Sequence, residues 1–155
     1  MNNEFHQKFI AATDIIEQAI SKFGNKLYVS YSGGKDSKAL LILTKMVSKK
    51  MGYIDMLVIH NEHPGEVIDN NFGTLVVKAP KTNVPAFLKM VDLEAQIDGT
   101  RRDEDKTVIF DGVEIHRSKM PSYKTNNGVF GLSVYYPLIN WTEEDIFKFL
   151  KDTKS

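Results

Sequence analysis

The chain has 155 residues, and its 20 Lys and Arg are balanced by 20 Asp and Glu, so the formal net charge is zero. This balance gives no general attraction to nucleic acid or to anionic membranes, so a preference for anions has to come from a local cluster. The absence of cysteine excludes disulfides, thiolate metal sites and thiol chemistry by this chain. We expect a single domain, residues 1–155, with a sizeable core. No apolar run is long enough for a membrane span and the first residues do not resemble a signal peptide, which predicts a cytoplasmic location.

Helical and strand-like apolar patterns alternate along the chain. Helices are predicted at 4–23, about 36–51, 66–71, from 82 or 83 to about 90, and from 142 to about 151. Strands are predicted at 26–31, 54–59, 74–77, 93–97 and 134–138, with a hairpin of 107–110 and 113–116 and a loop over 118–128. This alternation is typical of an α/β fold in which helices flank a mostly parallel central sheet. Ligands of such folds bind at the carboxyl ends of the strands.

Two of the predicted helices have a clear apolar side. The second helix is predicted to bury Ala39, Leu40, Leu43, Met46 and Val47. The first helix, 4–23, could cover the sheet or could pair with a second copy, and the sequence leaves a homodimer open.

A glycine turn joins the strand at 26–31 to the helix at 36–51, and it reads Ser32-Gly33-Gly34-Lys35-Asp36-Ser37. Adjacent glycines allow positive φ and close backbone approach, while the start of the helix offers unpaired N–H donors and its dipole. Lys35 adds a mobile positive charge, and Ser32 and Ser37 add hydroxyl donors. The turn therefore predicts a ligand that carries phosphate.

Other residues near this turn leave their roles open. Asp36 could hold Mg²⁺ beside phosphate oxygens, or it could lie in the first helical turn and interact favourably with the dipole. His60 and Asn61 follow the second strand, where they are expected to contact a base or ribose. A lone His-x-x-His in a turn is weak evidence for a metal.

A second cationic segment follows the strand at 93–97 and reads Gly99-Thr100-Arg101-Arg102. Two guanidinium groups beside a phosphate cradle can chelate oxyanions and offset developing negative charge. The alternative is that the acidic residues that follow pair with the arginines within the protein; they are Asp103, Glu104 and Asp105.

The glycine turn is not a Walker A loop, because Val29 and Asp36 stand where that motif has its first Gly and its Ser or Thr. It resembles the pyrophosphate loop (PP-loop) of the adenine-nucleotide α-hydrolase superfamily, which includes ATP pyrophosphatases, PAPS reductases and FAD synthetases. Gly99-Thr100-Arg101-Arg102 resembles the Gly-x-Arg-Arg loop of that group in its FAD synthetase form. The segment 136–146, with Pro137-Leu138 and Trp141-Thr142, resembles its Pro-Leu-x-x-Trp-Thr block.

The resemblance implies a three-layer Rossmann-like (HUP-type) fold that binds ATP or a related adenine nucleotide with Mg²⁺. The residues it implies in catalysis are Lys35, Asp36, Arg101 and Arg102. Those it implies in nucleotide contacts are Ser32, Gly33, Gly34, Lys35, Ser37, His60, Asn61 and Gly99, with Asp36 for the metal. Trp141 is predicted to anchor the last helix to the sheet.

Three functions follow from the resemblance. The first is an enzyme that cleaves ATP between the α- and β-phosphates, transfers AMP to an unidentified acceptor and releases pyrophosphate. The second is a PAPS reductase-like protein, although the catalytic cysteine of those enzymes is missing here and Asn61-Glu62-His63 replaces their usual Asp-Thr-Gly. The third is a non-catalytic nucleotide sensor or sequestering protein.

Overall fold

The computed structural model describes residues 3–52, 57–61, 75–79, 93–103, 107–110, 113–119, 123–124 and 132–153. The helices are α1 (Asn3–Phe23), α2 (Lys35–Lys50) and α4 (Glu143–Asp152), with short 3-10 helices η1 (Gly24–Lys26) and η4 (Arg117–Lys119). The strands are β1 (Leu27–Tyr31), β2 (Leu57–Asn61), β3 (Leu75–Ala79), β4 (Ala95–Ile97), β5 (Thr107–Phe110), β6 (Val113–His116), β7 (Tyr123–Lys124) and β8 (Ser133–Tyr135).

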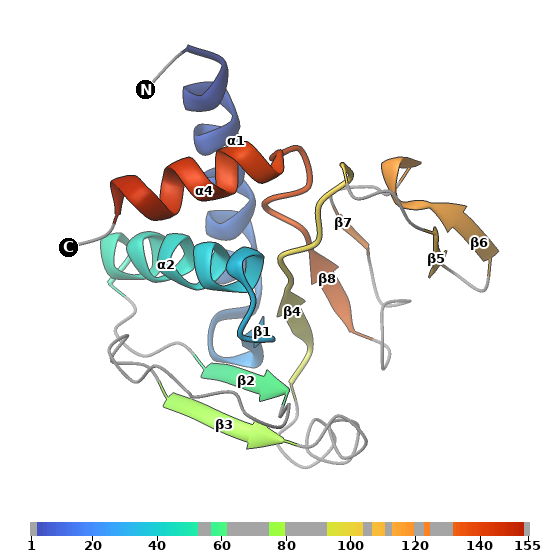
Figure 1. Cartoon of the computed structure of the whole chain (residues 1–155). Coiled ribbons are helices and arrows are strands. Elements are labelled where there is room, and N and C mark those ends of the chain that lie inside the picture. Colours follow the sequence, from blue (N-terminus) through green and yellow to red (C-terminus); the bar gives the residue numbers. More distant parts are fainter. Residues whose placement is uncertain are drawn as a thin grey trace.

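Six of these strands form one sheet in the order β3-β2-β1-β4-β8-β7 (Figure 1). Neighbouring strands from β3 to β8 are parallel, and β7 is antiparallel to β8. The other two strands, β5 and β6, form an antiparallel hairpin. The predicted α/β fold with a mostly parallel sheet is therefore confirmed.

The order of the strands places a switch point beside β1. The chain passes from β1 through α2 to β2 on one side of β1, whereas β4 pairs with β1 on the other side. In open parallel sheets the crevice for a ligand lies outside the carboxyl ends of the strands at such a point. The segments that begin there are the glycine turn after β1 and the arginine loop after β4.

The main core lies between the sheet and the three helices α1, α2 and α4, which pack on the same face (Figure 1). Alternate side chains of β1 lie on opposite faces of the sheet. Those of Leu27, Val29 and Tyr31 belong to this core, whereas that of Tyr28 belongs to a second cluster with Ile59. The apolar stripe of α1 covers the sheet with Ala12, Ile16 and Ala19 fully buried. None of the described helices is long and apolar enough to cross a membrane.

Trp141 anchors α4 as predicted. It is 1% exposed and makes edge contacts with Phe5 of α1 at 5.1 Å and Phe149 of α4 at 5.4 Å between ring centroids. Its indole N–H donates to the Lys8 carbonyl at 3.3 Å. The start of α4 is fixed by a capping box, in which Thr142 and Asp145 satisfy each other's backbone N–H groups.

Three sequence-based predictions were wrong in detail. The strand predicted at 134–138 ends at Tyr135, because the chain turns there, with the Ile139 N–H donating to the Tyr136 carbonyl at 3.2 Å. The loop predicted at 118–128 contains β7. Met46, predicted to be buried, is 46% exposed. The helices predicted at 66–71 and near 82–90 lie outside the described residues.

Candidate functional site

The glycine turn presents backbone donors at the carboxyl end of β1. Gly33 has φ 89°, a left-handed conformation that a side chain disfavours. Gly34 is the N-cap of α2 in an extended conformation, and no side chain caps the helix. Ser32, Gly33 and Gly34 are exposed. The first N–H groups of α2 therefore face an open turn, an arrangement that favours an anion.

Ser37 holds the turn together from the inside. Its hydroxyl donates to the Gly34 carbonyl at 3.1 Å and accepts from the Ser32 N–H at 3.2 Å. The two serine hydroxyls also lie 3.1 Å apart. Ser37 is only 6% exposed, so the structure gives it contacts that shape the turn, while Ser32 is the more accessible hydroxyl.

Gly99 brings the arginine loop against the glycine turn. A Cβ atom on Gly99 would lie 3.3 Å from the Asp36 carbonyl oxygen and 3.5 Å from the Ser37 nitrogen. The first of these two contacts is tighter than an ordinary van der Waals approach, and the second is an ordinary one. The absence of a side chain here lets the loop after β4 lie directly on the first turn of α2.

Arg101 is committed to carboxylates of the protein. It is 3% exposed, its Nε lies 3.1 Å from Asp36 Oδ2, and a terminal nitrogen contacts Asp103 Oδ1. The alternative in which an acidic neighbour pairs with an arginine thus holds for Arg101. Arg102 is half-buried, donates a side-chain hydrogen bond to Asn140 Oδ1, and is tied through its backbone N–H to the Ile139 carbonyl at 2.9 Å.

Lys35 and Glu143 extend these pairs to the start of α4. Lys35 Nζ lies 3.3 Å from Glu143 Oε1 and 3.6 Å from Asp36 Oδ1. The Glu143 N–H donates to Asp103 Oδ2 at 3.1 Å. Lys35, Asp36, Arg101, Asp103 and Glu143 are therefore linked in a closed circuit, called the charge ring below. It joins the first turns of α2 and α4 to the arginine loop.

Both carboxylate oxygens of Asp36 lie near cations of the protein in this arrangement. Oδ2 is paired with Arg101, and Oδ1 is buried and lies near Lys35. No group of three or more His, Asp or Glu side chains suited to a metal occurs among the described residues. Asp36 lies in the first turn of α2, where its negative charge interacts favourably with the helix dipole. Magnesium coordination by Asp36 stays a prediction.

A polar chain supports the arginine loop from the other face of the sheet. The Tyr28 hydroxyl donates to Gln96 Oε1 at 3.0 Å, and Gln96 Nε2 donates to Asp98 Oδ2 at 3.2 Å. Asp98 Oδ1 in turn accepts from the Thr100 N–H at 2.9 Å. Burial, and then the nearby charge of Asp98, raise the pKa of the Tyr28 phenol, so it stays a neutral donor.

The two residues predicted to contact the base or ribose, His60 and Asn61, are located by their strand and its register. His60 and Asn61 end β2, with His60 in register with Tyr31 of β1. They therefore lie at the same sheet edge as the glycine turn. The sequence reasoning missed Glu143, whose only signal was its place in the acidic start of the last helix, directly after Trp141-Thr142.

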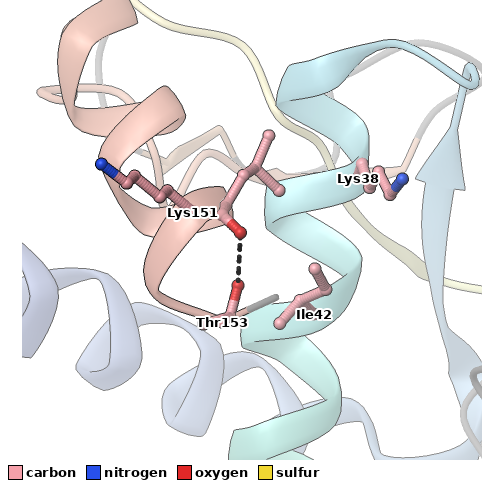
Figure 2. A pocket seen from close by; sticks show the side chains of 5 residues that line it. Lys38, Ile42, Lys151 and Thr153 are labelled. Carbon is pink, nitrogen blue, oxygen red and sulfur yellow. Dashed lines mark hydrogen bonds between the residues drawn. The ribbon is translucent and has the colours of Figure 1, made fainter. Parts of the chain in front are cut away.

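A hollow of about 390 Å³ lies elsewhere, between α2 and α4 (Figure 2). It is lined by Lys38, Ile42, Leu150, Lys151 and Thr153, and the Thr153 hydroxyl donates to the Leu150 carbonyl at 3.4 Å. Ile42 and Leu150 each follow the Lys35–Glu143 pair by seven residues, roughly 10 Å along a helix. The hollow is thus separate from the glycine turn.

No protein-family model and no curated protein matches the chain in sequence. Solved structures do match its fold. The structure superposes on FMN adenylyltransferase of Candida glabrata with a TM-score of 0.72 and 15% identity, covering 98% of this chain and 56% of that one. It superposes on yeast FAD synthetase in complex with FAD with a TM-score of 0.60 and 16% identity, covering 97% and 60%.

A third match is the phosphate complex of PAPS reductase from Candida auris, with a TM-score of 0.61, 11% identity, and coverage of 98% of this chain and 87% of that one. The Candida glabrata enzyme is also known with ATP, with FMN and an ATP analogue, and with FAD and inorganic pyrophosphate. The chain spans just over half the length of the FMN adenylyltransferase. Its fold is that of the FMN adenylyltransferases and PAPS reductases, as the PP-loop, arginine-loop and Pro-Leu-x-x-Trp-Thr resemblances predict.

Proposed function

We propose that the chain binds an adenine nucleotide at the glycine turn and cleaves ATP between its α- and β-phosphates, transferring AMP to an acceptor. The observation that carries the proposal is the meeting of two loops at the switch point: the uncapped start of α2 and the arginine loop that Gly99 seats against it. The Candida glabrata structures with ATP and with FAD and pyrophosphate support this chemistry by analogy of fold.

In the proposed reaction, a nucleophilic atom of the acceptor attacks the α-phosphorus. The bond between the α-phosphorus and the bridging oxygen breaks, and pyrophosphate leaves with the bonding electrons. The backbone N–H groups of residues 33–37 would hold the leaving pyrophosphate, with Lys35 and Ser32 at its edge. Such a transfer depends on positioning and electrostatics, so it needs no nucleophile from the protein. Mg²⁺ would enter with the nucleotide phosphates and offset part of their negative charge.

Arg102 is the arginine that we assign to the reacting phosphate. Arg101 is buried between Asp36 and Asp103 and holds the two loops at their spacing, whereas Arg102 lies half-buried at the loop surface. His60 and Asn61, at the end of β2, are proposed to contact the base or ribose.

The test is pyrophosphate release from ATP, measured with Mg²⁺ and a panel of acceptors that includes FMN. Lys35→Ala should lower release at least about a hundredfold, in line with the loss of a charge at a developing anion. Lys38→Ala is the matched control, because Lys38 is an exposed lysine one turn further along α2. Equal activity of the two variants would contradict the assignment of Lys35.

A sulfonucleotide-binding protein is the second candidate, favoured by the 87% coverage of the PAPS reductase chain. Because this chain has no cysteine, the thiol for a reduction would have to come from a partner. Tighter binding of PAPS than of ATP, with sulfite released only when a thiol protein is added, would select this candidate. Tight binding of either nucleotide without turnover would select a sensor.

A further inference from the structure

Lys35 is drawn toward α4 in this structure. Its ammonium lies 3.3 Å from Glu143 Oε1 and 6.0 Å from the centroid of the Phe147 ring, and both residues are on α4. Lys35 is also the first residue of α2, directly after the glycine turn. The cation nearest the predicted phosphate cradle is therefore held by a carboxylate from a distant part of the chain.

The backbone of Glu143 is fixed although its side chain is exposed. Its N–H donates to Asp103, which also contacts the buried Arg101, and the capping box of Thr142 and Asp145 sets the first turn of α4. The Glu143 side chain is 61% exposed and that of Lys35 is 34% exposed. The backbone of Glu143 thus keeps its carboxylate within reach of Lys35. The ion pair itself is weak, because both side chains are solvated.

The Lys35–Glu143 pair is the most solvated link of the charge ring. Two links involve the buried Arg101, and the link from Asp103 to Glu143 uses a backbone N–H group. The Lys35–Asp36 link, at 3.6 Å, ends on a carboxylate side chain that is less exposed than that of Glu143. An arriving polyphosphate could break the Lys35–Glu143 pair at small cost, and would leave the links through Arg101 and the Glu143 N–H intact. The Glu143 carboxylate would also repel the arriving anion until Lys35 turned toward it.

We propose that Glu143 is a positioning residue that competes with ligand phosphates for Lys35 and so lowers the affinity of the glycine turn for anions. The inference rests on the proposed function only in that the turn binds phosphate groups. Without a ligand, Lys35 stays against α4. When a pyrophosphate group occupies the turn, Lys35 transfers from Glu143 to it, and the start of α4 loses its ion pair with α2 but keeps its backbone hydrogen bond to Asp103.

The test uses inorganic pyrophosphate as the probe and calorimetry as the readout. Glu143→Gln should tighten pyrophosphate binding about three- to tenfold, because it removes both the competing pair and the repulsion. Glu144→Gln is the matched control: it removes the same charge from the same exposed first turn, with the same effect on the helix dipole. It should change the dissociation constant by less than about twofold.

A double-mutant cycle separates competition from a general change of structure. In a Lys35→Met background only the repulsion by the carboxylate remains, so the gain from Glu143→Gln should fall to less than about twofold. The Tm values of the four proteins of the cycle should agree within about 2 °C. The gain from Glu143→Gln should also shrink as salt is added.

Equal effects of the two glutamate variants would overturn the inference, as would a gain from Glu143→Gln that is equally large without Lys35. If neither wild type nor Glu143→Gln binds pyrophosphate, this inference and the proposed function both fail. If pyrophosphate binds with the expected dependence on Glu143 but ATP is not cleaved, the inference stands and only the proposed transfer reaction fails.

Discussion

Arg101 Nε lies 3.1 Å from Asp36 Oδ2, and this ion pair joins the loop after β4 to the first turn of α2. Since the Arg101 side chain is 4% exposed, its guanidinium has lost most of its water and depends on its protein partners. Those partners are carboxylates from two different segments, Asp36 and Asp103. The pair therefore fixes the spacing of the two loops on which the candidate site is built.

Replacement of Arg101 should damage the fold, whereas replacement of Arg102 should damage binding. Arg101→Ala would leave two carboxylates without their counterion, and we expect it to lower the free energy of unfolding by about 3 kcal/mol. Arg102→Ala should cost less than about 1 kcal/mol and weaken binding of ATP. Urea unfolding and calorimetry of both variants check this; a stable Arg101→Ala protein would contradict the role of the buried pair.

The two adjacent glycines should respond differently to a methyl group. Gly33→Ala places a side chain at φ 89° and should lower the free energy of unfolding by about 1–2 kcal/mol. Gly34→Ala is the control, because its Cβ would meet only the Ser32 hydroxyl oxygen at an ordinary 3.7 Å. Its stability should fall by less than about 1 kcal/mol. Thermal unfolding of the pair measures the difference, and a reversed order would show that the turn adopts another conformation.

The aromatic contacts of the last helix predict a second contrast in stability. Trp141→Ala should lower the free energy of unfolding by about 3–5 kcal/mol, because it opens a cavity between α1 and α4. Phe147→Ala removes an aromatic residue of the same helix that is 55% exposed, and should cost less than about 1 kcal/mol. Denaturant unfolding should be followed by circular dichroism. Trp141 is the one tryptophan of the sequence, so Trp141→Ala has no tryptophan fluorescence to report on unfolding.

Asp145 should make stability fall in acid. Burial by itself would raise the pKa of this carboxyl, but the hydrogen bond from the Thr142 N–H and the Lys8 ammonium at 2.9 Å together lower it below its ordinary value. A lowered native pKa gives stability that is present above the unfolded pKa of about 3.9 and is lost as pH falls through the native pKa.

The matching experiment compares wild type with Asp145→Asn in urea between pH 7 and pH 3. We expect the wild type to be more stable near neutral pH, and the difference to narrow below about pH 4. A difference that stays constant over this range would mean that Asp145 acts through packing or helix capping alone.

Local patterns predicted most of the fold. The glycine turn, the two long amphipathic helices and the start of the last helix near Thr142 depend on neighbouring residues, so their positions were correct to within one or two residues. Met46 was misplaced because its helix position alone does not show which elements pack beside it. The short strand β7 was missed because two residues carry no period, and only pairing with β8 defines it.

The candidate site was predicted in its parts but not in its connections. Sequence reasoning placed Lys35, Asp36 and Arg101 beside one another, and it offered both a ligand and an acidic neighbour as partners of the arginines. It could not link Lys35 to Glu143, because 108 positions separate them and only the packing of α4 beside α2 brings them together. Ion pairs between distant segments follow from tertiary structure and leave no periodic signal in the sequence.

The contacts between α1 and α4 also bear on how the chain folds during synthesis. Lys8 and Phe5, near the beginning, find their partners at Asp145 and Trp141, and the Lys8–Asp145 contact spans 137 positions. Helix α1 must therefore wait for the synthesis of α4 before its contacts with that helix can form. A nascent chain halted before Trp141 should stay accessible to proteases and chaperones, and the arrival of α4 would complete this packing in a single late step.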